Sequence, residues 1–183
     1  MIKKIIFLLF LSSAFVFSSC SFGSGRRLVS SEDKKADARI EQILEAIKAK
    51  DEGAIKALFS KQALVEIDDF DYGVDYLFDF FQGDVESWKR DKWSSDESIE
   101  KGKKSVMLRY WYTVSTNKEK YMFFVIDFTE DTINSNNAGL YTLRVIKAED
   151  RDTQFTYWQD MNIAGIYKPK DNEKTGTTPA INP

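Results

Sequence analysis

The spacing of apolar residues changes at about Gly83, and this change limits the folds that the chain can adopt. Before Gly83, apolar side chains recur every three or four residues, which is typical of one face of a helix. After it, apolar and polar side chains alternate, which is typical of strands with two unlike faces. Helices followed by a meandering antiparallel sheet predict an α+β domain, with the N-terminal helices packed on one face of a curved sheet.

The first helix is predicted over residues 32–50, because Ser30 and Asp33 have the spacing of a capping box. Asp51 is expected to cap a second, short helix, and Ser60 to begin a further helical turn. The apolar positions of the first helix share one face: Ala36, Ile40, Ile43, Leu44 and Ile47.

A further helix is predicted over residues 69–82, with Gly83 at its end. Asp71, Asp75 and Asp79 are four residues apart, so they fall on one stripe of this helix. The stripe could bind a cation or a basic ligand, but an ordinary solvated face is favoured. A calcium site is not expected, because the chain has no Asp-x-Asp-x-Asp-Gly loop.

The sequence pattern of the second half of the domain predicts four strands. Lys101 and Gly102 form the turn before the second strand, and Asn117 and Lys118 join the second and third strands as a hairpin. The polar segment 130–139 is expected to be an exposed loop before the last strand. The strands are predicted over residues 85–93, with the weakest pattern, and over 104–116, 121–128 and 140–147.

The first 19 residues have the pattern of a secretory signal, and they end at Cys20, the only cysteine. Lys3 and Lys4 precede an apolar run, and small residues come directly before the thiol. This pattern resembles the lipobox of bacterial lipoproteins, in which a diacylglycerol is attached to the cysteine sulfur before the signal is cut. The resemblance implies that Cys20 carries the lipid, and that the chain is held on the extracytoplasmic face of a membrane in the cell envelope.

Two alternatives to the lipid anchor remain open. One is an ordinary cleaved signal without a lipid. The other is an uncut membrane helix, which is disfavoured because the apolar run over residues 5–17 is shorter than the ~20 residues needed to span a bilayer. The remaining chain divides into a flexible tether over 20–29, a single α+β domain over 30–168 and a disordered tail over 169–183.

Composition excludes several classes of function. The formal net charge is −3, and the signal contributes two lysines and no acid, so the mature chain is more acidic still. This argues against nucleic acid as a partner, because phosphates are bound by clustered Lys and Arg. The chain has no histidine, which excludes Ser-His-Asp and Cys-His nucleophile systems and His-ligated metal sites. No cofactor or metal is expected.

Two segments carry a resemblance to a known family: residues 68–73 (DDFDYG) and 80–88 (FFQGDVESW). With the order of helices and long strands, they resemble an uncharacterised family of small bacterial lipoproteins, similar to the nuclear transport factor 2-like (cystatin-like) superfamily. The resemblance implies a cone in which a curved sheet wraps helices around a cavity, and dimerisation through the sheet face is common in such proteins. The superfamily contains enzymes, binding modules and assembly domains, so the fold does not define a function.

If the cone encloses a cavity, aromatic and polar side chains on the strands are expected to line it. The alternative for each ring is packing in the core of a domain that has no disulfide. An inward-pointing arginine would need an anionic partner. The alternation does not tell which face lies inside. The candidate pocket residues are Trp88, Arg109, Tyr110, Trp111, Tyr112, Asp127 and Arg144.

The sequence leaves two hypotheses about function open. The favoured one is a non-enzymatic domain that binds a small ligand or a protein partner, a second copy of the chain included. The alternative is a cavity enzyme of the isomerase or dehydratase type, in which Asp127 and Tyr110 or Tyr112 act as an acid–base pair. The first is favoured because an enzyme without histidine must raise the pKa of a carboxyl group by burial, and nothing in the sequence indicates such burial.

Overall fold

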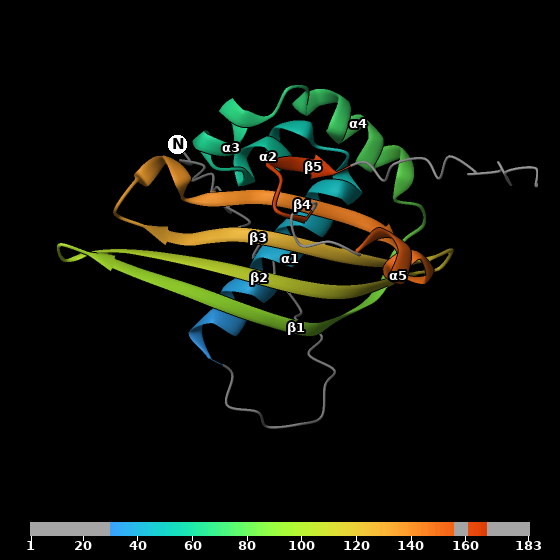
Figure 1. Cartoon of the computed structure of the whole chain (residues 1–183). Coiled ribbons are helices and arrows are strands. Elements are labelled where there is room, and N and C mark those ends of the chain that lie inside the picture. Colours follow the sequence, from blue (N-terminus) through green and yellow to red (C-terminus); the bar gives the residue numbers. More distant parts are fainter. Residues whose placement is uncertain (1–29, 156–160, 168–183) are drawn as a thin grey trace, which may run out of the picture.

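The computed structural model describes residues 30–155 and 161–167, and in it four helices cover one face of a five-stranded sheet (Figure 1). The helices come first along the chain, so the predicted α+β class is confirmed. Their bounds are α1 (Ser31–Ala49), α2 (Glu52–Leu58), α3 (Lys61–Glu66) and α4 (Phe70–Phe80). The strands are β1 (Val85–Glu100), β2 (Lys103–Thr116), β3 (Lys120–Asp131), β4 (Gly139–Lys147) and β5 (Gly165–Tyr167).

Each of the four helices begins directly after a residue whose side chain caps its N-terminus. Ser30 and Asp33 form the predicted capping box, with N–H···O distances of 3.0 and 3.1 Å. Asp51, Ser60 and Asp69 accept a hydrogen bond from the first turn of α2, α3 and α4, respectively. These side chains satisfy backbone N–H groups that have no partner inside the helix. The predicted starts are therefore confirmed, whereas α4 ends at Phe80, two residues earlier than expected.

The strands follow one another in sheet order β1-β2-β3-β4-β5, and the first four are antiparallel. The sheet is mostly antiparallel, as predicted, and the fifth strand, β5, which was not predicted, pairs parallel to the middle of β4. β1 continues to Glu100, seven residues beyond the prediction. Its second half is an exposed edge strand of mainly polar residues, so it shows no alternation. The turn at Lys101 and Gly102 has two left-handed residues, as a tight hairpin requires.

The main core lies between the helices and the sheet. The alternating side chains of β2 that face the helices are Val106, Leu108, Tyr110, Tyr112 and Val114, and all are buried. A smaller cluster around Phe124, Ile126 and Met161 lies on the opposite face of the sheet. That face is partly covered by the chain after β4, which forms η2 (Ala148–Asp150) and α5 (Arg151–Gln154) (Figure 1). The predicted loop between β3 and β4 contains a short helix, η1 (Ser135–Asn137).

No helix within residues 30–155 and 161–167 is long and apolar enough to cross a membrane. The predicted signal, Cys20, the tether and the tail over 169–183 lie outside the described residues.

Candidate functional site

A cleft of about 740 Å³ lies between the C-terminal half of α1 and the segment that connects α4 to β1. Its apolar lining residues are Leu44, Ile47, Phe78, Phe81, Val85 and Trp88. Its polar and charged lining residues are Glu41, Glu45, Lys48, Lys50, Gln82, Asp84, Asn117 and Lys118. Three acids and three lysines therefore surround an apolar floor.

Helix periodicity explains the wall that α1 contributes. Leu44 and Ile47 are three residues apart, so both face the core, and their buried side chains form part of the cleft floor. Glu41, Glu45 and Lys48 follow one another at four- and three-residue spacing along the solvent side of the cleft. The wall thus changes from apolar at its base to charged at its rim.

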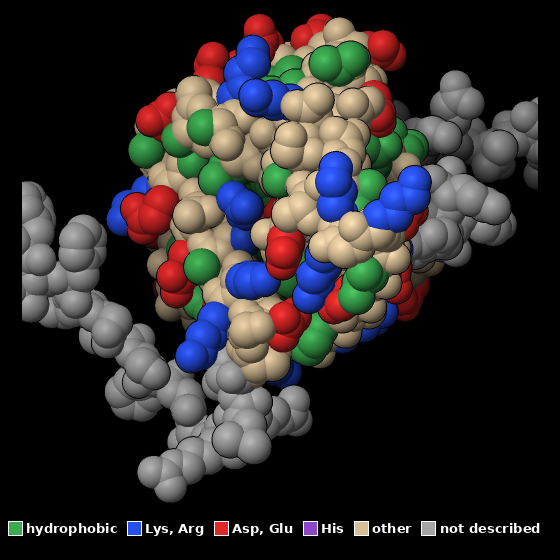
Figure 2. All heavy atoms as spheres, turned by 90° about the vertical axis from the view of Figure 1, so that its left-hand side faces the viewer, with side chains coloured by type: hydrophobic (Ala, Val, Ile, Leu, Met, Phe, Trp, Pro, Cys, Tyr) green, Lys and Arg blue, Asp and Glu red, His purple; other side chains and the backbone are tan. Residues whose placement is uncertain are grey.

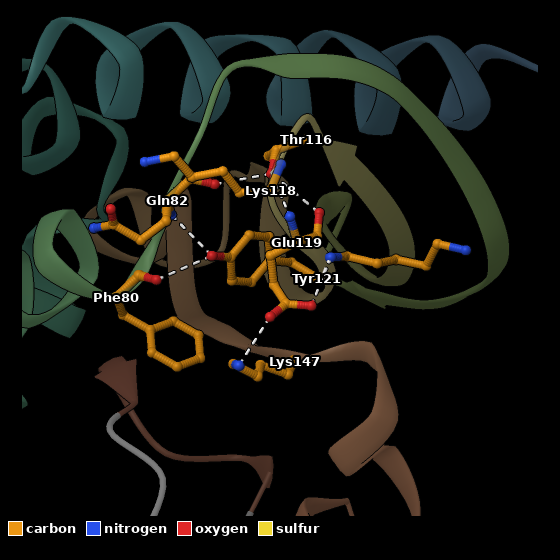
Figure 3. A network of polar contacts seen from close by, with 8 residues as sticks. Phe80, Gln82, Thr116, Lys118, Glu119, Tyr121 and Lys147 are labelled. Atoms are coloured by element: carbon orange, nitrogen blue, oxygen red, sulfur yellow. Dashed lines mark hydrogen bonds and ion pairs between the residues drawn. The ribbon is translucent and has the colours of Figure 1, made fainter.

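Hydrogen bonds fix the opposite wall to the turn between β2 and β3 (Figure 3). The Thr116 hydroxyl donates to the carbonyl of Gln82 at 2.8 Å. The Tyr121 hydroxyl accepts from the backbone N–H of Gln82 at 2.8 Å and donates to the carbonyl of Phe80 at 3.1 Å. Asp84 and Asn117 exchange two further hydrogen bonds, of 3.0 and 3.1 Å. These hydrogen bonds hold the wall against the turn.

Gly83 makes this connection possible. Its φ of 89° lies in the left-handed region, which favours glycine. A Cβ atom at this position would lie 2.5 Å from the side-chain oxygen of Asn117 and 2.9 Å from the hydroxyl of Thr116. A side chain would therefore push the connection away from the turn that holds it.

Trp88 is the one candidate pocket residue that lines this cleft, although all seven lie in the described part of the chain. Its ring is half-buried and packs edge-on against Tyr112, with ring centres 5.5 Å apart. The other lining residues were not predicted. Segment 80–88, which carried the family resemblance, was a signal only for those that it contributes itself, and it forms most of the fixed wall.

Tyr110, Tyr112 and Asp127 lie under α1 rather than in an open pocket. Asp127 is 1% exposed and accepts a hydrogen bond from Arg39 of α1 at 2.8 Å. The Tyr110 hydroxyl lies 3.4 Å from the same carboxylate. The structure thus brings together the predicted Asp127 and Tyr110, but within the buried contact between helix and sheet.

A second cluster of the same kind lies beside the first. The Tyr112 hydroxyl donates to Asp37 of α1, which also pairs with Arg90 of β1 at 2.8 Å. Arg90 reaches Asp33 as well, at 2.8 Å. Each cluster joins an arginine and a tyrosine to one or two carboxylates, so these polar groups between α1 and the sheet satisfy one another.

Burial keeps both tyrosines protonated. Burial and the nearby negative charge of Asp127 raise the pKa of Tyr110 well above its ordinary value. Burial and the hydrogen bond to Asp37 likewise raise the pKa of Tyr112. Neither tyrosine nor Asp127 lines the cleft beside α1. The arrangement therefore suits a structural role better than proton transfer to a substrate.

Arg109, Trp111 and Arg144 lie on the opposite face of the sheet. Arg109 forms an ion pair with the carboxylate of Asp96 on β1. The Lys92 ammonium lies 4.2 Å from the centre of the Trp111 ring. Arg144 is fully buried, and its guanidinium group stacks 3.7 Å from the centre of the Tyr167 ring. The seven candidates are thus divided between two faces, which the alternation alone did not resolve.

The comparison with known families gives one match. Residues 42–148 match the family model described as a domain of unknown function, DUF5104. The match covers more than half of the chain. The chain belongs to this family.

The DUF5104 match runs from within α1 to the residue after β4. Of the residues that line the cleft, Glu41 alone lies outside it. No curated protein matches the chain.

The acidic stripe of this DUF5104 protein points to solvent. Asp71, Asp75 and Asp79 are exposed on α4, and Lys56 lies 3.8 Å from Asp71. Within the described ranges no three acidic residues come together in a way that could hold a metal ion. The stripe therefore fits a solvated helix face.

Proposed function

We propose that this DUF5104 protein is a lipid-anchored, extracytoplasmic protein whose domain binds a small molecule in the cleft beside α1 and does not catalyse a reaction. The proposed lipid site is Cys20, supported by the sequence that precedes it. We also propose a nuclear transport factor 2-like relationship, supported by the order of the helices and the curved sheet that they cover.

The cleft and its fixed wall carry the proposal. A volume of about 740 Å³ lies within the range of ~300–1,000 Å³ that is usual for small-molecule sites. An apolar floor beneath a few polar groups is also usual for such sites, since the floor supplies affinity and the polar groups orient the ligand. Because hydrogen bonds already hold the wall at Gln82 and Asp84, binding would not have to order it.

Binding is favoured over catalysis because the acid–base pair is not where a substrate could reach it. Asp127 and Tyr110 are 1% and 0% exposed, and Arg39 covers the carboxylate from α1. Glu41 and Glu45, which line the cleft from α1, are exposed on the helix surface, and neither is enclosed beside a tyrosine hydroxyl.

A thermal-shift screen of a small-molecule library tests this proposal. Val85 lines the cleft and is 38% exposed, so Val85→Trp places a large ring in the open space. Val65→Trp is the matched control, because Val65 is 82% exposed and does not line the cleft beside α1.

Compounds that bind in the cleft should raise the melting temperature of the wild type and of Val65→Trp but not that of Val85→Trp, since only the folded protein with an open cleft binds them. The proposal fails if no compound raises the melting temperature of the wild type, or if every compound that does so stabilises Val85→Trp equally.

A further inference from the structure

A second, smaller cleft, of about 360 Å³, lies at the other end of the sheet. It is formed by α3, by η1, by the end of β3 and the start of β4, and by residues just before β5. Figure 2 looks onto the end of the molecule that carries η1. Basic and acidic side chains are intermixed there, with hydrophobic ones in small separate areas (Figure 2).

The polar groups that line this cleft are almost all uncharged. Amide groups come from Gln62, Asn137 and Asn162, and among the described lining residues there is no lysine or arginine. The one carboxylate is Glu66. An amide has two N–H donors and an acceptor oxygen. One N–H of Gln62 is bonded to Glu66, and Asn137 donates to Asp131 and accepts from Asn134, so each of these two amides keeps its second N–H for a ligand. A phosphate or carboxylate ligand would find no cation here, whereas a neutral ligand rich in hydroxyl groups would find matching donors and acceptors.

Hydrogen bonds within the protein already occupy the carboxylate of Glu66. It accepts from the Gln62 amide at 2.8 Å and from the Tyr141 hydroxyl at 2.8 Å. The bond from Gln62, and then that from Tyr141, lowers the pKa of Glu66, while burial and the bond to Glu66 raise the pKa of Tyr141. The carboxylate and the hydroxyl therefore stay bonded at neutral pH, and they hold α3 against β4.

Two aromatic rings form an apolar corner in the same cleft. The rings of Phe128 and Tyr141 are nearly perpendicular, at 81°, and their centres are 6.3 Å apart. A pyranose ring has C–H groups on its faces, which pack against aromatic rings, and hydroxyl groups around its edge, which hydrogen-bond to amides. We infer that this cleft binds a neutral pyranose sugar, with its face on the aromatic corner and its hydroxyl groups on the three amides.

Saturation-transfer difference NMR on the full chain, extracted in a detergent without a sugar headgroup, tests the inference. The probes are the methyl glycosides of glucose, galactose, mannose and N-acetylglucosamine, with sorbitol and glucose 6-phosphate for comparison. At least one glycoside should receive saturation at its ring C–H protons, and it should bind more tightly than glucose 6-phosphate. Signals no stronger than that of sorbitol, or preference for the phosphate, would overturn the inference.

A pair of asparagine variants localises the binding. Asn162 and Asn136 are both exposed, so neither substitution should disturb folding. Only Asn162 lines the cleft. Asn162→Ala should weaken sugar binding about five- to tenfold, as expected for the loss of one or two hydrogen bonds, and Asn136→Ala should leave it unchanged. Equal affinity in the two variants would contradict the assignment. Val85→Trp should bind the sugar normally, which separates this test from that of the larger cleft.

Discussion

At the scale of single residues, Gly83 and Gly102 provide a matched pair. Both have a positive φ, but a Cβ at Gly83 would contact the β2–β3 turn, whereas a Cβ at Gly102 would have nothing within 4 Å. Gly102→Ala should cost about 1 kcal/mol through backbone strain alone, and Gly83→Ala about 2 kcal/mol or more. Urea denaturation measures both losses. Equal losses would mean that the connection is not held against the turn as described.

Asp127 is predicted to stabilise the folded protein rather than to bind a ligand. Asp127→Ala leaves Arg39 without its partner at a largely buried position, so it should cost about 3 kcal/mol. Asp75→Ala, on the exposed acidic stripe, should change stability by less than about 0.5 kcal/mol.

The milder variant Tyr110→Phe distinguishes structure from catalysis. It removes a long hydrogen bond and should cost about 1 kcal/mol, with no effect on ligand binding in the larger cleft. Loss of a turnover activity in Tyr110→Phe, at a temperature where the variant is folded, would instead support the cavity enzyme.

At the scale of elements, Asp131 holds the connection between β3 and β4. It accepts hydrogen bonds from the backbone N–H of Asn134, the amide of Asn137 and the hydroxyl of Ser105. Burial alone would raise the pKa of Asp131, but these hydrogen bonds outweigh it, and the pKa is lowered in the folded protein.

A lowered pKa in the folded state means that Asp131 contributes stability above its unfolded pKa of about 4, and that this contribution is lost as the pH falls through the folded value. Asp131→Asn should therefore cost about 1 kcal/mol at pH 7 and progressively less below pH 4. Denaturation curves of wild type and variant across pH 2–7 measure the difference. Asp79→Asn, on an exposed helix face, is the control, and a difference for Asp131→Asn that stayed constant with pH would contradict the account.

The start of a helix could be predicted from the sequence where a nearby side chain determines it. The starts of α1 to α4 follow from Ser30, Asp51, Ser60 and Asp69, because a cap acts within three residues of itself. β5 was missed because three residues are too few to show a period, and its parallel pairing depends on the chain returning to β4. The larger cleft was largely missed for a similar reason, since its walls meet only when segment 82–85 docks on the turn after β2.

At the scale of the whole molecule, the proposed anchor predicts where the protein is found. Cys20→Ser removes the sulfur to which a diacylglycerol would be attached, so the protein should leave the membrane fraction, and its mass should lack acyl chains. Fractionation and intact mass spectrometry measure both. A variant that stays bound to the membrane as firmly as the wild type would favour an uncut helix or another mode of attachment.

Native mass spectrometry of the wild-type protein released from its own membrane tests the central claim most directly. The account predicts a chain that begins at Cys20, carries a diacylglycerol and retains a small molecule, which Val65→Trp keeps and Val85→Trp loses. An empty wild-type protein, or a retained molecule that Val85→Trp holds equally well, would contradict the assignment of the cleft beside α1 as a binding site.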